Sequence, residues 1–287
     1  MDIVLERKGF RLALIPNLGG SVRSFTLDGR NILFPASEQS PSSPLETAGF
    51  PLFPFSGRIR DGAFSWNGRA VQLDANFAPE PHTIHGQAWL AAWTTDSITS
   101  DQARLSFEYR PNDWPWPYRA TQHFELTDDG LKLTLTLENL SAEEMPAGLG
   151  WHPYFPRGDA ELSANVSSVW VAEHGKIPDR QVQLCKDTDI RTARPVNALH
   201  LDNAFVAQPA NADIVWPSSG LCVSIRSTPE FGHLVVYVPE GMDFFCVEPV
   251  SHAPDAINSR YEQKVTGLQR LAPGEILEAC IYLKVGG

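Results

Sequence analysis

The chain of 287 residues is 43% hydrophobic and carries a formal net charge of −11. This composition allows a large buried core, and we expect one domain over residues 1–287, because β-sandwiches of this size often form single units. The acidic residues are scattered, which argues against a nucleic-acid partner, since nucleic acid requires a concentrated basic surface. The sequence contains no run of 18 apolar residues, so we expect no membrane partner.

The N-terminal residues 1–8 contain no apolar segment typical of a secretion signal, so the expected location is cytoplasmic. Four cysteines show neither C-x-x-C nor zinc-site spacing and are expected to be reduced, largely buried thiols: Cys185, Cys222, Cys246 and Cys280.

Two turn signals predict β-hairpins in the first quarter of the chain. They are Asp28-Gly29, between residues 22–27 and 31–34, and Asn67-Gly68, between residues 64–66 and 71–73. Residues 36–54 lie between them and are rich in serine and proline. We expect this segment to be a long loop of the kind on which binding sites are built.

Strand-period patterning dominates the rest of the chain. Four leucines alternate with polar residues over residues 131–137, and the run 118–126 precedes them across a turn at residues 127–130. Further short runs are rich in β-branched or aromatic residues, at 169–172, 223–226, 234–238 and 244–247. No long window has a helical period, and 23 prolines and 21 glycines interrupt the chain. The pattern predicts an all-β fold, a large antiparallel β-sandwich.

Several common catalytic motifs are absent from the sequence. It has no G-x-S-x-G elbow, no P-loop and no dinucleotide fingerprint. His82 and His85 could suggest a metal pair, but residues three apart on a strand point to opposite faces. We therefore expect no metal site from these two histidines.

Polar residues stand inside four otherwise apolar or aromatic segments, at residues 53–62, 85–89, 148–155 and 244–252. Glu248 ends an apolar strand, on the same face as Phe244 and Cys246. Partial desolvation there would raise the pKa of its carboxyl group toward the range of a general base. The alternative is a strand-end glutamate that pairs with an arginine or faces solvent.

The histidines and Arg58 also have two interpretations each. His152 faces opposite to Trp151 and could therefore face a cleft, while Pro153 indicates a strand end or a sheet edge. His152 and His85 could equally be structural histidines. Arg58 could be a buried structural cation or a donor to ligand hydroxyls.

Taken together and in order, these segments resemble the aldose 1-epimerase (mutarotase) family. The matching pieces are G-R-I-R-D-G-x-F-x-W-N-G from Gly57, H-G at His85, H-P-Y-F from His152, L-D-N-x-F from Leu201 and E-P-V from Glu248. The resemblance implies a galactose mutarotase-like β-sandwich with a sugar cleft. It implies an isomerase that interconverts the α and β anomers of a free hexose without cofactor or metal.

The resemblance also assigns roles to residues. It implies that Glu248 is the general base, that His152 is the general acid, and that His85 lies near the ring oxygen and the anomeric centre. Arg58 and Asp202 match residues that hydrogen-bond sugar hydroxyls. Candidates for packing on the apolar face of the sugar are Trp89, Trp116 and Phe155.

Two departures from the family pattern leave the preferred sugar open. Many members have asparagine where this chain has Gly57, and the full-length galactose enzymes differ around the acid histidine. A hexose-6-phosphate epimerase is one alternative, with Arg60, Arg119 or Arg157 as the phosphate clamp. Others are a non-catalytic carbohydrate-binding protein of the same fold and a metal-dependent isomerase of the cupin type. The expected partner is a small-molecule sugar, and the protein is expected to be a monomer or a homodimer.

Overall fold

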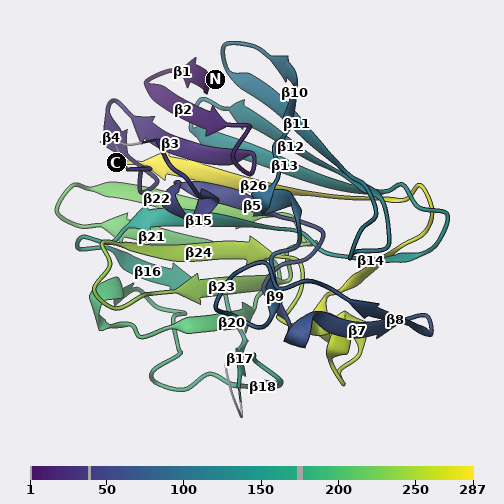
Figure 1. Ribbon diagram of the computed structural model, residues 1–287. Helices are drawn as coiled ribbons and strands as arrows, with labels where there is room; N and C mark the ends of the chain where they lie inside the picture. Colours follow the sequence, from purple (N-terminus) through teal and green to yellow (C-terminus); the bar gives the residue numbers. More distant parts are fainter. Residues whose placement is uncertain (1, 38–39, 173–176) are drawn as a thin grey trace.

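The structure is a computed structural model that describes residues 2–37, 40–172 and 177–287. Two large antiparallel sheets dominate it (Figure 1), so the prediction of a large antiparallel β-sandwich is confirmed. Within the described residues, no helix is both long and apolar enough to cross a membrane.

The first sheet has 11 strands. Its order is β1 (Ile3–Arg7), β2 (Phe10–Ile15), β3 (Ser21–Leu27), β5 (Gly49–Leu52), β15 (Gly150–Pro156), β24 (Phe244–Val250), β23 (His233–Tyr237), β20 (Asp202–Val206), β17 (Ser168–Val171) and β18 (Arg180–Gln183), and β4 (Arg30–Asn31) pairs with β3.

The second sheet has nine strands. Its order is β10 (Thr94–Ile98), β11 (Gln102–Tyr109), β12 (Tyr118–Leu126), β13 (Gly130–Asn139), β26 (Ile276–Gly286), β22 (Leu221–Ser227), β21 (Ala212–Trp216), β16 (Glu161–Ala164) and β19 (Arg194–Pro195).

Smaller elements lie around these sheets. Three two-stranded pairs are β6 (Arg58–Ile59) with β9 (Thr83–Ile84), β7 (Ala63–Trp66) with β8 (Arg69–Gln72), and β14 (Met145–Ala147) with β25 (Gln269–Leu271). The helical turns of the described chain are η1 (Pro44–Glu46), η2 (Arg60–Gly62), η3 (Ala88–Leu90), η4 (Val196–Ala198), η5 (Ala256–Asn258) and α1 (Gln263–Thr266). Figure 1 shows β9 and the β7–β8 hairpin together near one end of the large sheets.

Both predicted hairpins are present. Asn67 and Gly68 have φ angles of 48° and 82°, and Asp28 and Gly29 have 47° and 80°. Positive φ at both central residues is the requirement of the tight turn that joins twisted antiparallel strands. The second strand of the earlier hairpin is short, because β4 covers only Arg30–Asn31 rather than residues 31–34.

Alternation along each strand decides which side chains fill the space between the sheets. On β15, Trp151 and Phe155 are fully buried in the main hydrophobic cluster, as are Phe245 and Val247 on β24. Their neighbours therefore point to the outer face of the 11-stranded sheet. His152, Tyr154 and Glu248 are among these neighbours and line a cavity there.

The prediction of a loop over residues 36–54 is wrong in its second half. η1 and β5 lie in this segment, and all four residues of β5 are buried between β3 and β15. The sequence pattern did not predict this strand, because the run is short, contains glycine and proline, and has no alternation of apolar and polar residues. Positions 38–39 of the predicted loop lie outside the described residues.

Pro153 does not mark a sheet edge, because β15 continues through it to Pro156 and has neighbours on both sides. Proline is tolerated here because the ladder between β15 and β24 is interrupted. The strands pair at Gly150–Val250 and again from Tyr154–Cys246, and the three positions between have no ladder partner on β24. Pro153 and Pro249, which lack an N–H group, fall in this interval.

Candidate active site

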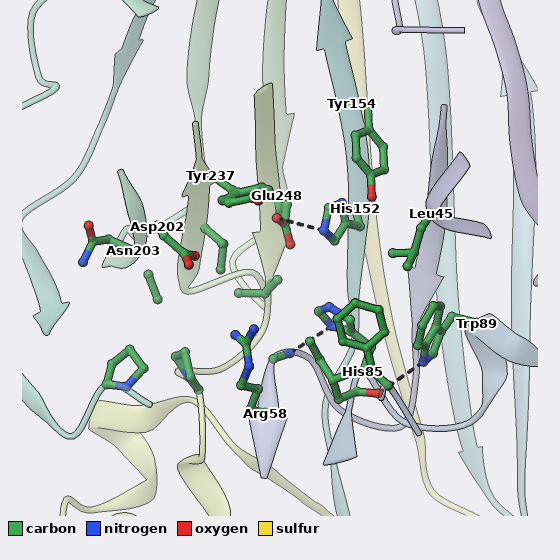
Figure 2. A pocket seen from close by; sticks show the side chains of 18 of the residues that line it. Leu45, Arg58, His85, Trp89, His152, Tyr154, Asp202, Asn203, Tyr237 and Glu248 are labelled. Carbon is green, nitrogen blue, oxygen red and sulfur yellow. Dashed lines mark hydrogen bonds and ion pairs between the residues drawn. The ribbon is translucent and has the colours of Figure 1, made fainter. Parts of the chain in front are cut away.

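A cavity of about 330 Å³ lies on the outer face of the 11-stranded sheet. Its floor comes from strands β15, β20, β23 and β24, and the β6 and β9 segments contribute one wall. Figure 2 shows polar side chains that line this space from different elements: Arg58, His85, His152, Asp202, Tyr237 and Glu248.

His152 and Glu248 form a close pair at the floor of the cavity. His152 Nε2 lies 3.3 Å from Glu248 Oε1, as Figure 2 shows. The two residues stand opposite each other in the interval where the β15–β24 ladder is open, on the same face of adjacent strands. Both are buried, with exposed fractions of 8% for His152 and 3% for Glu248.

Burial shifts both members of the pair toward their neutral forms. It lowers the pKa of His152 to about 3. It also raises the pKa of Glu248 well above its ordinary value, and the nearby negative charge of Asp202 adds to this shift while Arg58 opposes it. Both shifts favour a neutral pair, with the proton on Glu248 and a neutral His152 ring.

The position of the His152 ring is set by aromatic packing. Its centroid lies 4.7 Å from that of Phe50 and 4.9 Å from that of Tyr154, with interplanar angles of 24° and 26°. Phe50 also stacks on Trp89 and meets His85 edge-on. One fully buried phenyl ring on β5 thus contacts both histidines of the site.

His85 enters the cavity from a strained turn. Its φ is 61°, in the left-handed region, and Gly86 follows with a φ of 70°. The backbone N–H of Gly57 donates to His85 Nδ1 at 3.1 Å. Burial, together with His152 and Arg58, holds the pKa of His85 well below its ordinary value. The ring is therefore neutral, and with Nδ1 accepting, its proton sits on Nε2.

Arg58 lines the cavity from β6 and is about one-quarter exposed. Its Nε lies 3.7 Å from Glu80 Oε2, and this nitrogen has no hydrogen-bond partner within the described residues. A guanidinium N–H with unused donor capacity in a cavity is suited to a ligand hydroxyl.

Asp202 begins β20 opposite Tyr237 on β23, and both side chains line the cavity. Asn203 follows Asp202 and lines the cavity as well, while its side-chain amide donates to the Trp170 carbonyl. This side of the cavity presents a carboxylate and a phenol to a ligand.

Six of the residues that the sequence analysis considered for a sugar site line this one cavity: Arg58, His85, Trp89, His152, Asp202 and Glu248. Trp89 is only 1% exposed, and its indole N–H donates to the carbonyls of Ile84 and Gly86. Its contribution to the cavity wall is therefore small.

Other sequence candidates lie elsewhere. Trp116 and Phe155 are buried in the core between the sheets and do not line the cavity. His82 Nδ1 accepts the backbone N–H of Asp61, away from His85. Tyr154 is the aromatic residue of H-P-Y-F that faces the cavity, and strand alternation from His152 could have identified it. Phe50 and Tyr237 carried no recognisable signal, and Asn203 stood in the L-D-N-x-F piece without an assigned role.

One set of side chains in the described chain could hold a metal ion. The ligand atoms of His152, Cys246 and Glu248 all lie within 4.8 Å of one another. Cys246 is fully buried, whereas the other three cysteines are exposed or half-buried, contrary to the expectation for them.

Comparison with known proteins agrees with this geometry. The model of the aldose 1-epimerase family matches residues 1–284. The chain belongs to the aldose 1-epimerase family. It is 31% identical over 280 residues to the uncharacterized protein YphB of Escherichia coli K12, covering 94% of each chain.

Solved structures confirm the galactose mutarotase-like fold. A crystal structure from Escherichia coli K12, provisionally named an aldose 1-epimerase, has a TM-score of 0.90 at 31% identity, over 100% of this chain and 99% of that one. A galactose mutarotase-like protein from Clostridium acetobutylicum has a TM-score of 0.87 at 20% identity, over 100% and 95% of the two chains. The second similarity supports the fold alone.

Proposed function

We propose that this protein interconverts the α and β anomers of a free hexose by general acid–base opening and closure of the sugar ring. One observation carries the proposal: a buried histidine–glutamate pair, 3.3 Å apart, at the floor of a polar cavity in a member of this family. Membership in the family supports a sugar as the substrate, and the proposal assigns the proton transfers to the pair.

Ring opening requires one proton to leave the C1 hydroxyl and another to reach the ring oxygen. In the proposed mechanism Glu248 accepts the first proton and His152 donates the second, which breaks the bond between C1 and the ring oxygen and forms the aldehyde. Rotation about C1–C2 presents the other face of the aldehyde. Closure returns both protons, and each transfer contributes about 10²–10⁴-fold to the rate.

The number of protons on the pair is the same before and after ring opening in this cycle. Burial favours the neutral pair, with the proton on Glu248, so a shift of this proton from Glu248 to His152 precedes opening in the proposed cycle. Opening then returns the pair to a neutral His152 and a protonated Glu248. Because the two residues are 3.3 Å apart and keep one proton between them throughout the cycle, no exchange with solvent is required during the reaction. The same pair runs the reaction in both directions, as an epimerase needs.

The remaining polar residues are proposed to bind the sugar. His85 is a neutral donor through Nε2, which fits a hydrogen bond to the ring oxygen or to a hydroxyl better than full proton transfer. Arg58 donates to hydroxyls, and Asp202 accepts from them on the opposite side of the cavity.

Charge favours a free sugar over its phosphate. Among the described residues that line the cavity there are one arginine, Arg58, and two carboxylates, Glu248 and Asp202. The arginines considered for a phosphate clamp are engaged elsewhere: Arg60 with Asp255, Arg119 with Glu108 and Glu138, and Arg157 with Asn197 and backbone carbonyls. A phosphate dianion beside two carboxylates and one cation is disfavoured.

The test is anomer exchange followed by NMR on matched pairs of free hexoses and their 6-phosphates at one ionic strength. We expect a higher kcat/KM for the free sugar. Glu248→Gln should fold normally and lose at least about 10²-fold in rate, because an amide cannot accept the C1 proton. Glu240→Gln, at an exposed position, is the matched control.

Two results would overturn parts of the proposal. A near wild-type rate in Glu248→Gln would remove Glu248 as the base. A tenfold preference for the phosphorylated sugar would replace the substrate class and leave the acid–base pair in place. Sugar binding without exchange in the wild-type protein would favour the non-catalytic alternative.

A further inference from the structure

The floor of the cavity gathers three side chains of types that bind transition metals. His152 comes from β15, and Cys246 and Glu248 come from β24, two residues apart and on one strand face. Because Tyr154 pairs with Cys246, His152 lies opposite Glu248 and diagonal to Cys246. The ligand atoms of all three lie within 4.8 Å of one another.

The spacing and the donor types suit one class of ion. Zinc lies about 2.0–2.3 Å from each ligand atom, so two ligand atoms of one zinc ion are less than twice that distance apart. The ligand atoms of this set lie within 4.8 Å of one another, so shifts of under an ångström would bring all three to bonding distance of one ion. A thiolate, an imidazole and a carboxylate form a mixed set that favours zinc over magnesium or calcium, which prefer oxygen ligands alone. Three protein ligands with a fourth position open to water is a common zinc arrangement.

We propose that His152, Cys246 and Glu248 form a zinc-binding site through which zinc reversibly inhibits this protein. The inhibition rests on the proposed function, because two of the ligands are the acid–base pair. A bound ion occupies His152 Nε2 and a carboxylate oxygen of Glu248, the atoms that exchange protons with the sugar. The cavity gives the ion a route to the floor and leaves room for water on its open side.

Cys246 distinguishes this site from the catalytic pair. It does not line the cavity and is fully buried beneath it, so it has no contact with the sugar in the proposed mechanism. On zinc binding the thiol proton and the proton held by the His152–Glu248 pair both leave to solvent as the bonds to zinc form, with no change of oxidation state. Sugar and zinc compete, because both require the same atoms of His152 and Glu248.

The experiment combines metal titration with anomer exchange on the same protein. Cobalt(II) is the spectroscopic probe, because a cobalt–thiolate bond produces a near-ultraviolet charge-transfer band. Zinc is the inhibitor. Cys246→Ala and Cys246→Ser are compared with Cys222→Ala, a half-buried cysteine on the other sheet. Each variant is scored against its own metal-free rate, and circular dichroism confirms its folding.

We expect one equivalent of cobalt to give the charge-transfer band in the wild type and in Cys222→Ala. Both Cys246 variants should lose the band and need at least about tenfold more zinc for half inhibition. Saturating sugar should weaken zinc binding, and EDTA should leave the metal-free rate unchanged. If neither Cys246 variant folds, loss of the wild-type band on addition of sugar still tests the site.

The failures of the two proposals are distinguishable. Absence of the cobalt band, or zinc inhibition that is unchanged in the Cys246 variants, overturns the zinc site and leaves the epimerase proposal untouched. A cobalt band that depends on Cys246, in a protein without exchange activity on any sugar, overturns the epimerase. An EDTA-sensitive rate that zinc restores would make the ion a cofactor and contradict its role as an inhibitor.

Discussion

The two histidines of the cavity differ in what their ring nitrogens contact. His152 faces Glu248 through Nε2, and within the described residues its buried Nδ1 has no hydrogen-bond partner. His85 has Nδ1 fixed by the backbone N–H of Gly57 and presents Nε2 to the cavity. Only His152 can share a proton with the carboxylate, so the two residues should contribute to different kinetic constants.

This difference predicts opposite kinetic effects of the same substitution. His152→Asn should lower kcat by at least about 10²-fold with little change in KM, because proton donation operates in the transition state. His85→Asn should mainly raise KM. Asparagine tolerates the left-handed backbone at position 85, so this variant is not penalised by its φ of 61°. Steady-state anomer exchange on both variants is the measurement.

The reverse pattern, a KM effect at His152 and a kcat effect at His85, would exchange the proposed roles. Equal loss of kcat in both variants would mean that the histidines act as one unit, and double-variant kinetics would then measure their coupling.

Among single residues, the sequence predicted those site residues whose direction follows from their immediate neighbours in the chain. Strand alternation predicted that His152 and Trp151 point to opposite faces of the sheet, and that Glu248 and Cys246 point to the same face. The structure has both arrangements. Phe50 and Tyr237 were missed, because each is an aromatic residue on a short strand. Only the pairing of distant strands brings Phe50 against His152 and Tyr237 to the cavity wall. Their roles come from tertiary packing, which the local pattern does not encode.

At the scale of elements, the site depends on irregular backbone more than on regular strands. His85 projects from a turn between β9 and η3, and Gly86 forms a parallel bridge with Phe53. Its carbonyl accepts hydrogen bonds from Asn76 and Trp89. The turn joins the β6–β9 wall of the cavity to the segment that follows β5.

Gly86→Ala should be strongly destabilising. A Cβ at Gly86 would lie 2.0 Å from the Phe53 carbonyl oxygen, at a φ of 70°. The backbone strain and the overlap together should cost ~2–4 kcal/mol of unfolding free energy. Activity should fall as well, because relief of the overlap moves the turn that carries His85. Urea denaturation and anomer exchange measure the two effects.

Gly29→Ala is the matched control for this prediction. Its φ of 80° imposes a similar backbone strain, but no atom lies within 4 Å of the added Cβ. It should lose only ~1–2 kcal/mol and keep full activity. Equal losses of unfolding free energy in the two variants would mean that the backbone around Phe53 moves away from the added Cβ at no measurable cost.

The elements that sequence patterning predicted well are those with clear alternation or a tight turn. β13 and the β7–β8 hairpin are examples. β5 was predicted as loop, because Gly49 and Pro51 are poor strand formers and all four of its residues are buried. Pro153 was expected to end a strand, because proline at an interior position is tolerated only where the ladder is already open. Both errors fall beside the His152–Glu248 pair, where the backbone departs from regular pairing.

At the scale of the whole molecule, the two sheets share one extensive apolar core, and four histidines are buried in or near it. Burial lowers the pKa of His152 and of His233 to about 3, that of His252 to about 4, and that of His85 well below its ordinary value. All four are therefore neutral in the folded protein at pH values where they are protonated in the unfolded chain.

This arrangement predicts a loss of stability in mild acid. The unfolded chain gains protons on these histidines as the pH falls below about 6.5, whereas the folded protein does not until much lower pH, so the free energy of unfolding decreases over that interval. Glu248 and Asp255 act in the opposite sense, because their raised pKa values make the folded state the better proton acceptor. The histidines are more numerous, so the net effect is destabilising between about pH 6.5 and 4.5.

His233→Leu isolates one part of this effect. Within the described chain neither ring nitrogen of His233 has a hydrogen-bond partner, so leucine removes the titration without breaking a bond. The slope of unfolding free energy against pH should become shallower by up to about 1.4 kcal/mol per pH unit between pH 6 and 4.5. His252→Leu should instead destabilise at every pH, because His252 accepts the N–H of Ser56 and lies 2.8 Å from the Ala253 carbonyl. Urea denaturation at several pH values measures both, and an unchanged slope in His233→Leu would mean that His233 is protonated in the folded protein.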